Sequence, residues 1–192
     1  MRRANVRSSC GLTFVETMVA STIAVSVGLV AVVWMTGLSD LWNTASTQAQ
    51  MRLNAQLGMN RLVDELRSAT RTAAGSPPNV SIPAAPNNTT MTCYLPADLD
   101  GNGSIIDATG NLEWGATAIQ YARYAASRQL RRTAGGQTLV IANDVQSVTF
   151  EDAAINSALY ANEVKITLTL QATTAQRRTV SATAVEIVKL RN

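Results

Sequence analysis

The sequence of 192 residues contains no histidine and only two cysteines. Without histidine, a Ser-His or Cys-His catalytic pair, a histidine metal ligand and a histidine pH switch are all excluded. If residues 1–11 are removed as a leader, Cys10 leaves with them and Cys93 is a single thiol, which we interpret as a small residue packed in the domain. The adjacent Glu151 and Asp152 need no explanation beyond solvation, so we expect no enzymatic activity.

Charge is also missing over one long stretch. No charged residue occurs from Thr17 to Ser39, where most side chains are apolar, and about 20 such residues span a bilayer. Arg2, Arg3 and Arg7 precede this stretch, so the positive-inside rule keeps them in the cytoplasm. We therefore expect a single-pass membrane protein with its C-terminal domain outside the cytoplasm.

The same three arginines account for the formal net charge of +3, and the rest of the chain is neutral. A nucleic-acid partner gains no electrostatic support from this balance.

Proline is absent before Pro77. This absence and the run of good helix formers predict one helix from about Thr13 to about Ser68, which is about 84 Å long at 1.5 Å per residue. Its distal half is amphipathic, with apolar residues recurring at spacings of three and four. On the opposite face we expect solvated ion pairs, Arg61 with Glu65 and Asp64 with Arg67.

All five prolines lie in residues 72–116, which we interpret as a surface loop region. Beyond it, residues 163–171 alternate strictly between apolar and polar side chains, as a half-buried antiparallel strand does. Weaker strand patterns occur over 118–124, 129–132, 145–151 and 179–190, and the last has a phase slip near Ala184 that indicates a bulge.

These patterns predict an α+β fold in which a long N-terminal helix packs on a small antiparallel sheet of four or five strands. The expected divisions are a leader at 1–11, a transmembrane helix at 12–39, an amphipathic helix at 40–71, the loop region at 72–116 and the sheet domain at 117–192.

A glutamate stands at the start of the apolar stretch. A charged group in a hydrocarbon segment costs about 2.5 to 3.5 kcal/mol on insertion scales and is usually paired. A cut after Gly11 would create a partner, because the freed amine of Leu12 would lie one helical turn from Glu16. A neighbouring subunit could offer its own amine to the same carboxylate.

The segment Gly11-Leu-Thr-Phe-Val-Glu16, followed by Val19-Ala-x-x-Ile-Ala, resembles the class III leader of type IV pilins and type II secretion pseudopilins. The resemblance implies that the chain is inserted in a bacterial inner membrane, and that a prepilin peptidase cuts after Gly11 and methylates Leu12. It implies further that Glu16 pairs with the terminal amine of an adjacent subunit, and that the apolar helices pack into the core of a filament.

The layout of the remainder, including residues 51–69 and the closing residues 190–192, is similar to W-type minor pilins and J-type minor pseudopilins. In those families a bulkier β domain sits on the helix and the subunit acts near the filament tip. The expected function is therefore that of a minor pilin or pseudopilin. The alternative is a binding module, such as a sensor or adhesin, on a permanent signal anchor that never polymerises.

A second candidate site follows Pro96. Asp98, Asp100 and Asn102 occupy positions 1, 3 and 5 of a calcium loop and Gly103 its turn position. The candidate Ca²⁺ ligands are Asp98, Asp100, Asn102, Ser104 and Asp107. Position 12 is Thr109 rather than an acidic residue, and paired Asp-Gly and Asn-Gly turns that need no metal explain the same residues.

Overall fold

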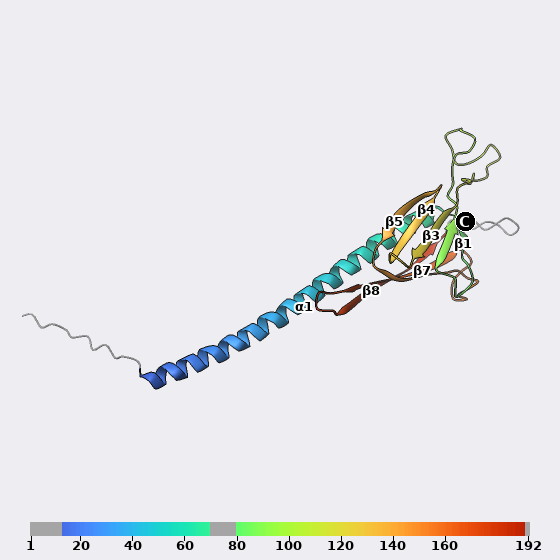
Figure 1. Cartoon of the computed structure of the whole chain (residues 1–192). Helices are drawn as coiled ribbons and strands as arrows, with labels where there is room; N and C mark the ends of the chain where they lie inside the picture. Colours follow the sequence, from blue (N-terminus) through green and yellow to red (C-terminus); the bar gives the residue numbers. More distant parts are fainter. Residues whose placement is uncertain (1–12, 70–79, 191–192) are drawn as a thin grey trace, which may run out of the picture. The chain divides into compact units, whose positions relative to one another are not determined.

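The structure is a computed structural model that describes residues 13–69 and 80–190. It contains one long helix, α1 (Phe14–Ser68), and eight strands in two antiparallel sheets, so the predicted α+β fold is confirmed (Figure 1). Contacts divide the chain into two units, Met1–Asn43 and Thr44–Asn192. Helix α1 contributes to both.

Helix α1 has 55 residues and matches the predicted range closely. Its part in the first unit is apolar and its side chains are exposed, with a window of mean hydropathy 2.2 of which none is buried. Among the described residues, α1 is the helix that is long and apolar enough to span a membrane, by length and composition.

The part of α1 in the second unit buries one face. The buried positions recur at spacings of three and four and are Met51, Ala55, Gly58, Met59, Leu62, Val63 and Leu66. Gly58 lies where the helix approaches both sheets, because a Cβ built there would be 3.2 Å from the Cβ of Ala142 and 3.7 Å from Cδ2 of Leu168. The two contacted residues belong to different sheets, so α1 packs across the place where the sheets meet.

The first sheet has five strands in sequence order. They are β1 (Val80–Ser81), β2 (Thr90–Cys93), β3 (Ile119–Tyr124), β4 (Gln129–Ala134) and β5 (Gln137–Ala142). Strands β1 and β2 fall within the segment that we interpreted as loop, and β5 has no counterpart among the expected strands. Gly135 and Gly136, with φ of 55° and 78°, form the tight turn that joins β4 to β5.

The second sheet has three strands, β6 (Val145–Glu151), β7 (Glu163–Thr173) and β8 (Thr179–Lys189). The strict alternation of β7 is confirmed, with Val164, Ile166, Leu168 and Leu170 all buried. The expected bulge near Ala184 is wrong, because β8 pairs with β7 without a break from Lys189 to Thr179. The apolar residues that caused the phase slip lie instead on the exposed face of β8.

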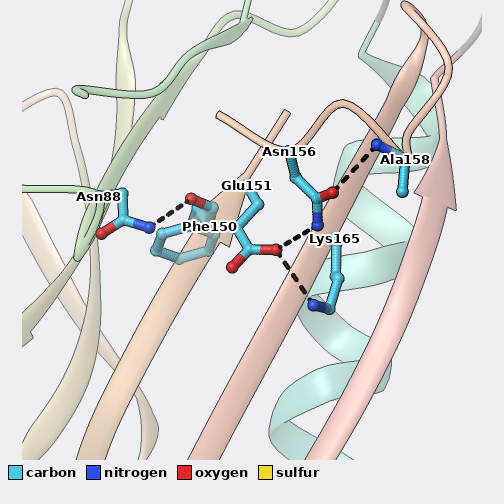
Figure 2. Close-up of polar contacts among 6 residues, drawn as sticks. All are labelled: Asn88, Phe150, Glu151, Asn156, Ala158 and Lys165. Atoms are coloured by element: carbon cyan, nitrogen blue, oxygen red, sulfur yellow. Dashed lines mark hydrogen bonds and ion pairs between the residues drawn. The ribbon is translucent and has the colours of Figure 1, made fainter. Parts of the chain in front are cut away.

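The prediction of one sheet with four or five strands is therefore corrected to two sheets. Strand β6 links them: the backbone N–H of Phe150 donates to the Asn88 carbonyl at 2.8 Å, and Nδ2 of Asn88 donates back to the Phe150 carbonyl at 3.2 Å (Figure 2). Arg123 adds a bond from Nε to the Val145 carbonyl at 3.1 Å. The buried Asn88 amide is thus part of the fold.

Candidate functional site

Glu16 lies in the first turn of α1 and caps it. Its Oε2 accepts hydrogen bonds from the backbone N–H of Thr13 at 2.8 Å and from Oγ1 of Thr13 at 2.9 Å, while the backbone N–H of Glu16 donates to the same hydroxyl at 3.3 Å. This reciprocal pair is a capping box, which satisfies backbone donors that a helix start leaves open. The carboxylate therefore has a local partner in a single chain.

The capping role was missed in the sequence, although its signal is plain. Threonine followed three residues later by glutamate, just before an apolar run, is the standard signature of a capping box. The predicted cleavage residue Gly11 and the predicted methylated residue Leu12 lie outside the described residues. Pairing of Glu16 with an amine of Leu12 stays a prediction.

The hydroxyl groups of the apolar stretch bond to the backbone of their own helix. The hydroxyls of Thr17, Thr22 and Ser26 each donate to the carbonyl four residues earlier, and those of Ser21 and Thr36 to the carbonyl three residues earlier. An unpaired hydroxyl in an apolar medium would cost several kcal/mol. These side chains consequently need no outside partner in lipid or in a packed helix bundle.

The acidic loop after Pro96 is built from short-range turns. Oδ1 of Asp98 accepts from the Gly101 N–H at 2.7 Å and Oδ2 accepts from the Gly103 N–H at 2.8 Å. These bonds, led by that from Gly103, lower the pKa of Asp98 below its ordinary value. Gly101 and Gly103 have φ of 76° and 80°, which side-chain-bearing residues rarely adopt.

The next predicted ligands continue the same pattern. Asp100 accepts from the Asn102 N–H at 3.0 Å, Asn102 accepts from the Ser104 N–H at 2.6 Å, and the Ser104 hydroxyl accepts from the Ile106 N–H at 3.1 Å. Each side chain thus folds the loop locally, which is what Asp-Gly and Asn-Gly turns require without a metal.

Asp107 closes a separate turn. It accepts from Oγ1 of Thr109 at 2.6 Å and from the backbone N–H groups of Thr109 and Asn111, and these bonds, led by the Thr109 hydroxyl, lower its pKa. The acidic group that the structure gathers consists instead of Asp98, Asp100 and Glu113, with one oxygen of each within 4.8 Å of the others. Asp107 is not a member of this group.

Glu113 was missed because it lies 15 residues after Asp98. The chain turns back after the loop and brings Glu113 beside it. Its Oε2 accepts from the Leu99 N–H at 2.6 Å, and the bridge between Pro96 and Trp114 holds the two ends of the excursion together. Three carboxylates at this spacing are chemically suited to a hard cation such as Ca²⁺, so calcium binding stays a prediction with Glu113 as an added ligand.

A partly buried polar cluster joins α1 to the five-stranded sheet. Glu65 accepts from the hydroxyl of Tyr121 and from Nε of Arg132, the latter at 2.7 Å. The expected solvated pair of Arg61 with Glu65 is therefore corrected: Glu65 turns toward the sheet, whereas Asp64 and Arg67 form the expected exposed pair at 3.9 Å. Both side chains of the Glu65–Arg132 pair are about a quarter exposed.

Cys93 lies beside this cluster and is fully buried with no disulfide partner among the described residues, as its interpretation as a packed residue predicts. Burial and, to a smaller extent, the carboxylate of Glu65 raise the pKa of the thiol to about 12, against the opposing effect of Arg132. A thiol with such a pKa is a poor nucleophile.

Glu151 is part of the fold rather than a merely solvated residue. Its Oε2 accepts from Nδ2 of Asn156 at 2.9 Å and from Nζ of Lys165 at 3.1 Å (Figure 2). These two contacts lower the pKa of Glu151, with the Asn156 bond the larger cause. They stabilise the ionised carboxylate and fix the loop between β6 and β7.

Comparisons of the chain with models of protein families, with curated proteins and with solved structures found no match.

Proposed function

We propose that this chain is a minor pilin or pseudopilin, a structural subunit of a type IV pilus or a type II secretion pseudopilus. The observation that carries the proposal is the first part of α1. Its apolar side chains are exposed along the whole stretch, and between Thr13 and Asp40 its single charged residue is Glu16. Such a helix needs a bilayer or neighbouring helices to bury it.

The hydrogen bonds of the polar groups are compatible with both a bilayer and a bundle of helices. Hydroxyls that are bonded within their own helix need no partner in lipid or in a dry contact between helices. A subunit that leaves the inner membrane and enters a filament core exchanges lipid for neighbouring helices. Hydroxyls that are already hydrogen-bonded within α1 need no new partner after this exchange, and this favours the transfer.

Glu16 is proposed to pair with the N-terminal amine of an adjacent subunit after a prepilin peptidase has cut behind Gly11 and methylated Leu12. A carboxylate has two oxygens with about four acceptor positions. In the single chain one oxygen, Oε2, receives the bonds from Thr13. The carboxylate therefore has acceptor capacity left for an amine, and a bond to an ammonium group would have two charged partners, whereas in the cap only the carboxylate is charged.

The test separates the cap from the charge. Glutamine replaces glutamate in a capping box, so Glu16→Gln keeps the cap and removes the negative charge. Thr13→Ala removes the side-chain hydroxyl of the cap and keeps the charge. We expect Glu16→Gln, like Glu16→Ala, to be processed and inserted but to reduce incorporation into filaments at least about tenfold, the effect of roughly 1.4 kcal/mol.

Thr13→Ala, the control, should retain most incorporation, because loss of a cap costs only about 1 kcal/mol of helix stability. Equal loss for Thr13→Ala and Glu16→Gln would assign the defect to the helix start and remove the assembly role of the charge. Full incorporation of Glu16→Gln would remove the assembly role of the charge, whereas absence of the parent chain itself from filaments would favour the alternative, an anchored binding module that does not polymerise.

Processing has its own test. Substitution of Gly11 by a bulky residue, such as Gly11→Leu, should leave the leader attached, since the peptidase is expected to need the small residue at the cut. Normal cleavage of this variant would remove the processing assignment.

A further inference from the structure

Strand β8 is the edge of the three-stranded sheet, and its second side is unpaired among the described residues. All of its 11 residues pair with β7 in one continuous register. In an antiparallel pair about half of the backbone groups of each strand point to the partner and the others point away. One row of N–H and C=O groups along β8 is therefore available to another strand.

The usual protections of an edge strand are missing over most of β8. Residues 179–185 contain no proline and no charged residue, and no bulge interrupts their pairing. The charged residues Glu186 and Lys189 stand toward one end only. On the outer face, Val185 and Ile187 are each 52% exposed. Natural edge strands of this length normally carry charges, prolines or bulges that prevent strand addition.

A groove of about 590 Å³ runs between β8 and α1. Ala182 and Ala184 are small residues on the inner face of β8, so they leave room beside the helix. On the helix side the groove is lined by Arg52, Gln56 and Asn60, which are spaced four residues apart and lie along one side of α1. Alternate side chains of a strand added to β8 would enter this groove.

From these features we infer that β8 is a strand-addition site for an extended segment of a different protein chain. Main-chain bonds to β8 would supply affinity, and the groove would supply selectivity. Arg52 and Glu186 both line the groove, and neither belongs to an ion pair in the described part of the chain, where the pairs include Asp64–Arg67, Glu65–Arg132 and Glu151–Lys165. The segment accordingly carries an acidic and a basic side chain on the face that enters the groove and apolar side chains on the face beside Val185 and Ile187.

A second copy of β8 fits this groove poorly. Parallel pairing in register would place Glu186 of one copy beside Glu186 of the other. In either orientation, the face of a second β8 that enters the groove would carry Glu186 and no basic side chain, so it would supply no cation for the Glu186 already there. This argument uses only the edge, the groove and their charges and does not depend on the proposed membrane anchoring.

The test uses the full chain in detergent micelles and a synthetic peptide of about six residues, a usual strand length. The peptide alternates valine with polar residues, and the polar residues include one aspartate and one lysine, tested in both orders. We expect saturable binding by fluorescence anisotropy and slower amide exchange in Thr179–Lys189. N-methylation of alternate peptide amides should weaken binding at least about tenfold, because it removes donors to β8.

Two matched variants localise the binding. Val185→Lys adds a charge to the exposed face of the edge strand, and Thr167→Lys adds the same charge to its register partner on the central strand β7. Val185→Lys should weaken peptide binding about tenfold and Thr167→Lys by less than about twofold. Both positions are on the outer face of the sheet, so neither substitution disturbs the core.

The inference is overturned if no peptide binds, if the N-methylated peptide binds equally well, or if Val185→Lys has no more effect than Thr167→Lys. Light scattering that shows a dimer of the chain, lost in Val185→Lys, would replace the different chain by a second copy. None of these readouts involves filaments, so failure here is distinct from failure of the proposed function.

Discussion

The two parts of α1 have the same backbone conformation and opposite surroundings. From Phe14 to Asn43 the apolar side chains are exposed, and from Met51 to Leu66 an apolar face is buried on the sheets. The difference shows that hydrophobic content alone does not decide what a helix packs against. The second part alternates apolar and polar faces and finds its cover within the chain, while the first is apolar on all sides and requires cover from outside.

The carboxylates of the two parts of α1 also differ in how far away in the sequence their hydrogen-bond partners lie. Glu16 is bound by Thr13, three residues away, whereas Glu65 is bound by side chains that lie 56 and 67 residues away in the sequence. A locally capped carboxylate remains accessible to a partner chain. A carboxylate bound by residues of another element instead fixes the helix to the sheet. Glu16 thus leaves the start of α1 available to a partner chain, and Glu65 fixes the last turns of α1 to the domain.

The largest expected effect comes from replacing a leucine by alanine in the buried part of α1, and the same replacement in the exposed part is its control. Leu62→Ala removes a side chain that is 1% exposed and should destabilise the domain by about 2 to 5 kcal/mol. Leu29→Ala removes one that is 63% exposed in the chain and should change the free energy of unfolding of the domain by less than about 0.5 kcal/mol. Both changes in the free energy of unfolding are measured by denaturant unfolding of the full chain in micelles. The circular dichroism of the sheets reports the unfolding. Similar losses in the two variants would contradict the division of α1.

A smaller effect is expected at Glu65. Glu65→Ala leaves the Tyr121 hydroxyl and the Arg132 guanidinium without their shared acceptor, and should cost about 2 kcal/mol. The control is Asp64→Ala, because the pair of Asp64 with Arg67 is largely exposed and such pairs contribute at most about 0.5 kcal/mol on a helix. Thermal unfolding of both variants gives the comparison, and an equal shift would show that the partly buried cluster does not fix the helix.

The cluster also predicts a dependence on alkaline pH. The pKa of Cys93 rises from its ordinary value of 9.0 to about 12 on folding, so the folded state holds the thiol proton more tightly than the unfolded state does. The associated stability is complete below about pH 9 and is lost as the pH rises toward 12. The pKa of Tyr121 is also raised, first by burial and then by its bond to Glu65, with the same sign.

Unfolding measured from pH 7 to 11 should therefore show a decline that begins near pH 9 in the parent chain and nearer pH 10 in Cys93→Ala, where the ordinary titration of tyrosine sets the onset. Identical profiles for the two chains would place the thiol outside the cluster.

How far the sequence predicts this structure depends on the range of the contacts. The absence of proline, the capping residues and the apolar spacing are local, so they determine α1 within a residue or two. The alternation of β7 is local as well. By contrast, β1 and β2 are short strands that form only against β3, and the Gly135-Gly136 turn that indicates β5 was overlooked. The partner of Glu65 lies in another element, and helix spacing gave Arg61 as a nearer choice.

The acidic loop follows the same rule. Asp98, Asp100 and Asn102 are adjacent in sequence and their pattern is recognisable, whereas Glu113 joins them only through the return of the chain. Asp107 was chosen as a ligand by counting positions along the loop, whereas Glu113 lies beside Asp98 and Asp100 in space and far from them in sequence.

The smallest predicted effect distinguishes those two ligand sets. Millimolar Ca²⁺ should raise the unfolding temperature of the chain slightly, since a ligand that binds the folded state stabilises it by RT ln(1 + [L]/Kd), which is about 0.4 kcal/mol at a concentration equal to its Kd. Glu113→Gln should abolish the rise and Asp107→Asn should retain most of it. The reverse order would restore the sequence-based ligand set, and no rise in the parent chain would leave the loop a set of turns without metal.

The most direct test of the central claim is the mass of the mature N-terminus of the protein purified from its own membrane. Processing as a pilin-like subunit predicts a chain that begins at Leu12 and carries one methyl group on its amine. A chain that retains residues 1–11, or that begins at Leu12 without methylation, would contradict the claim.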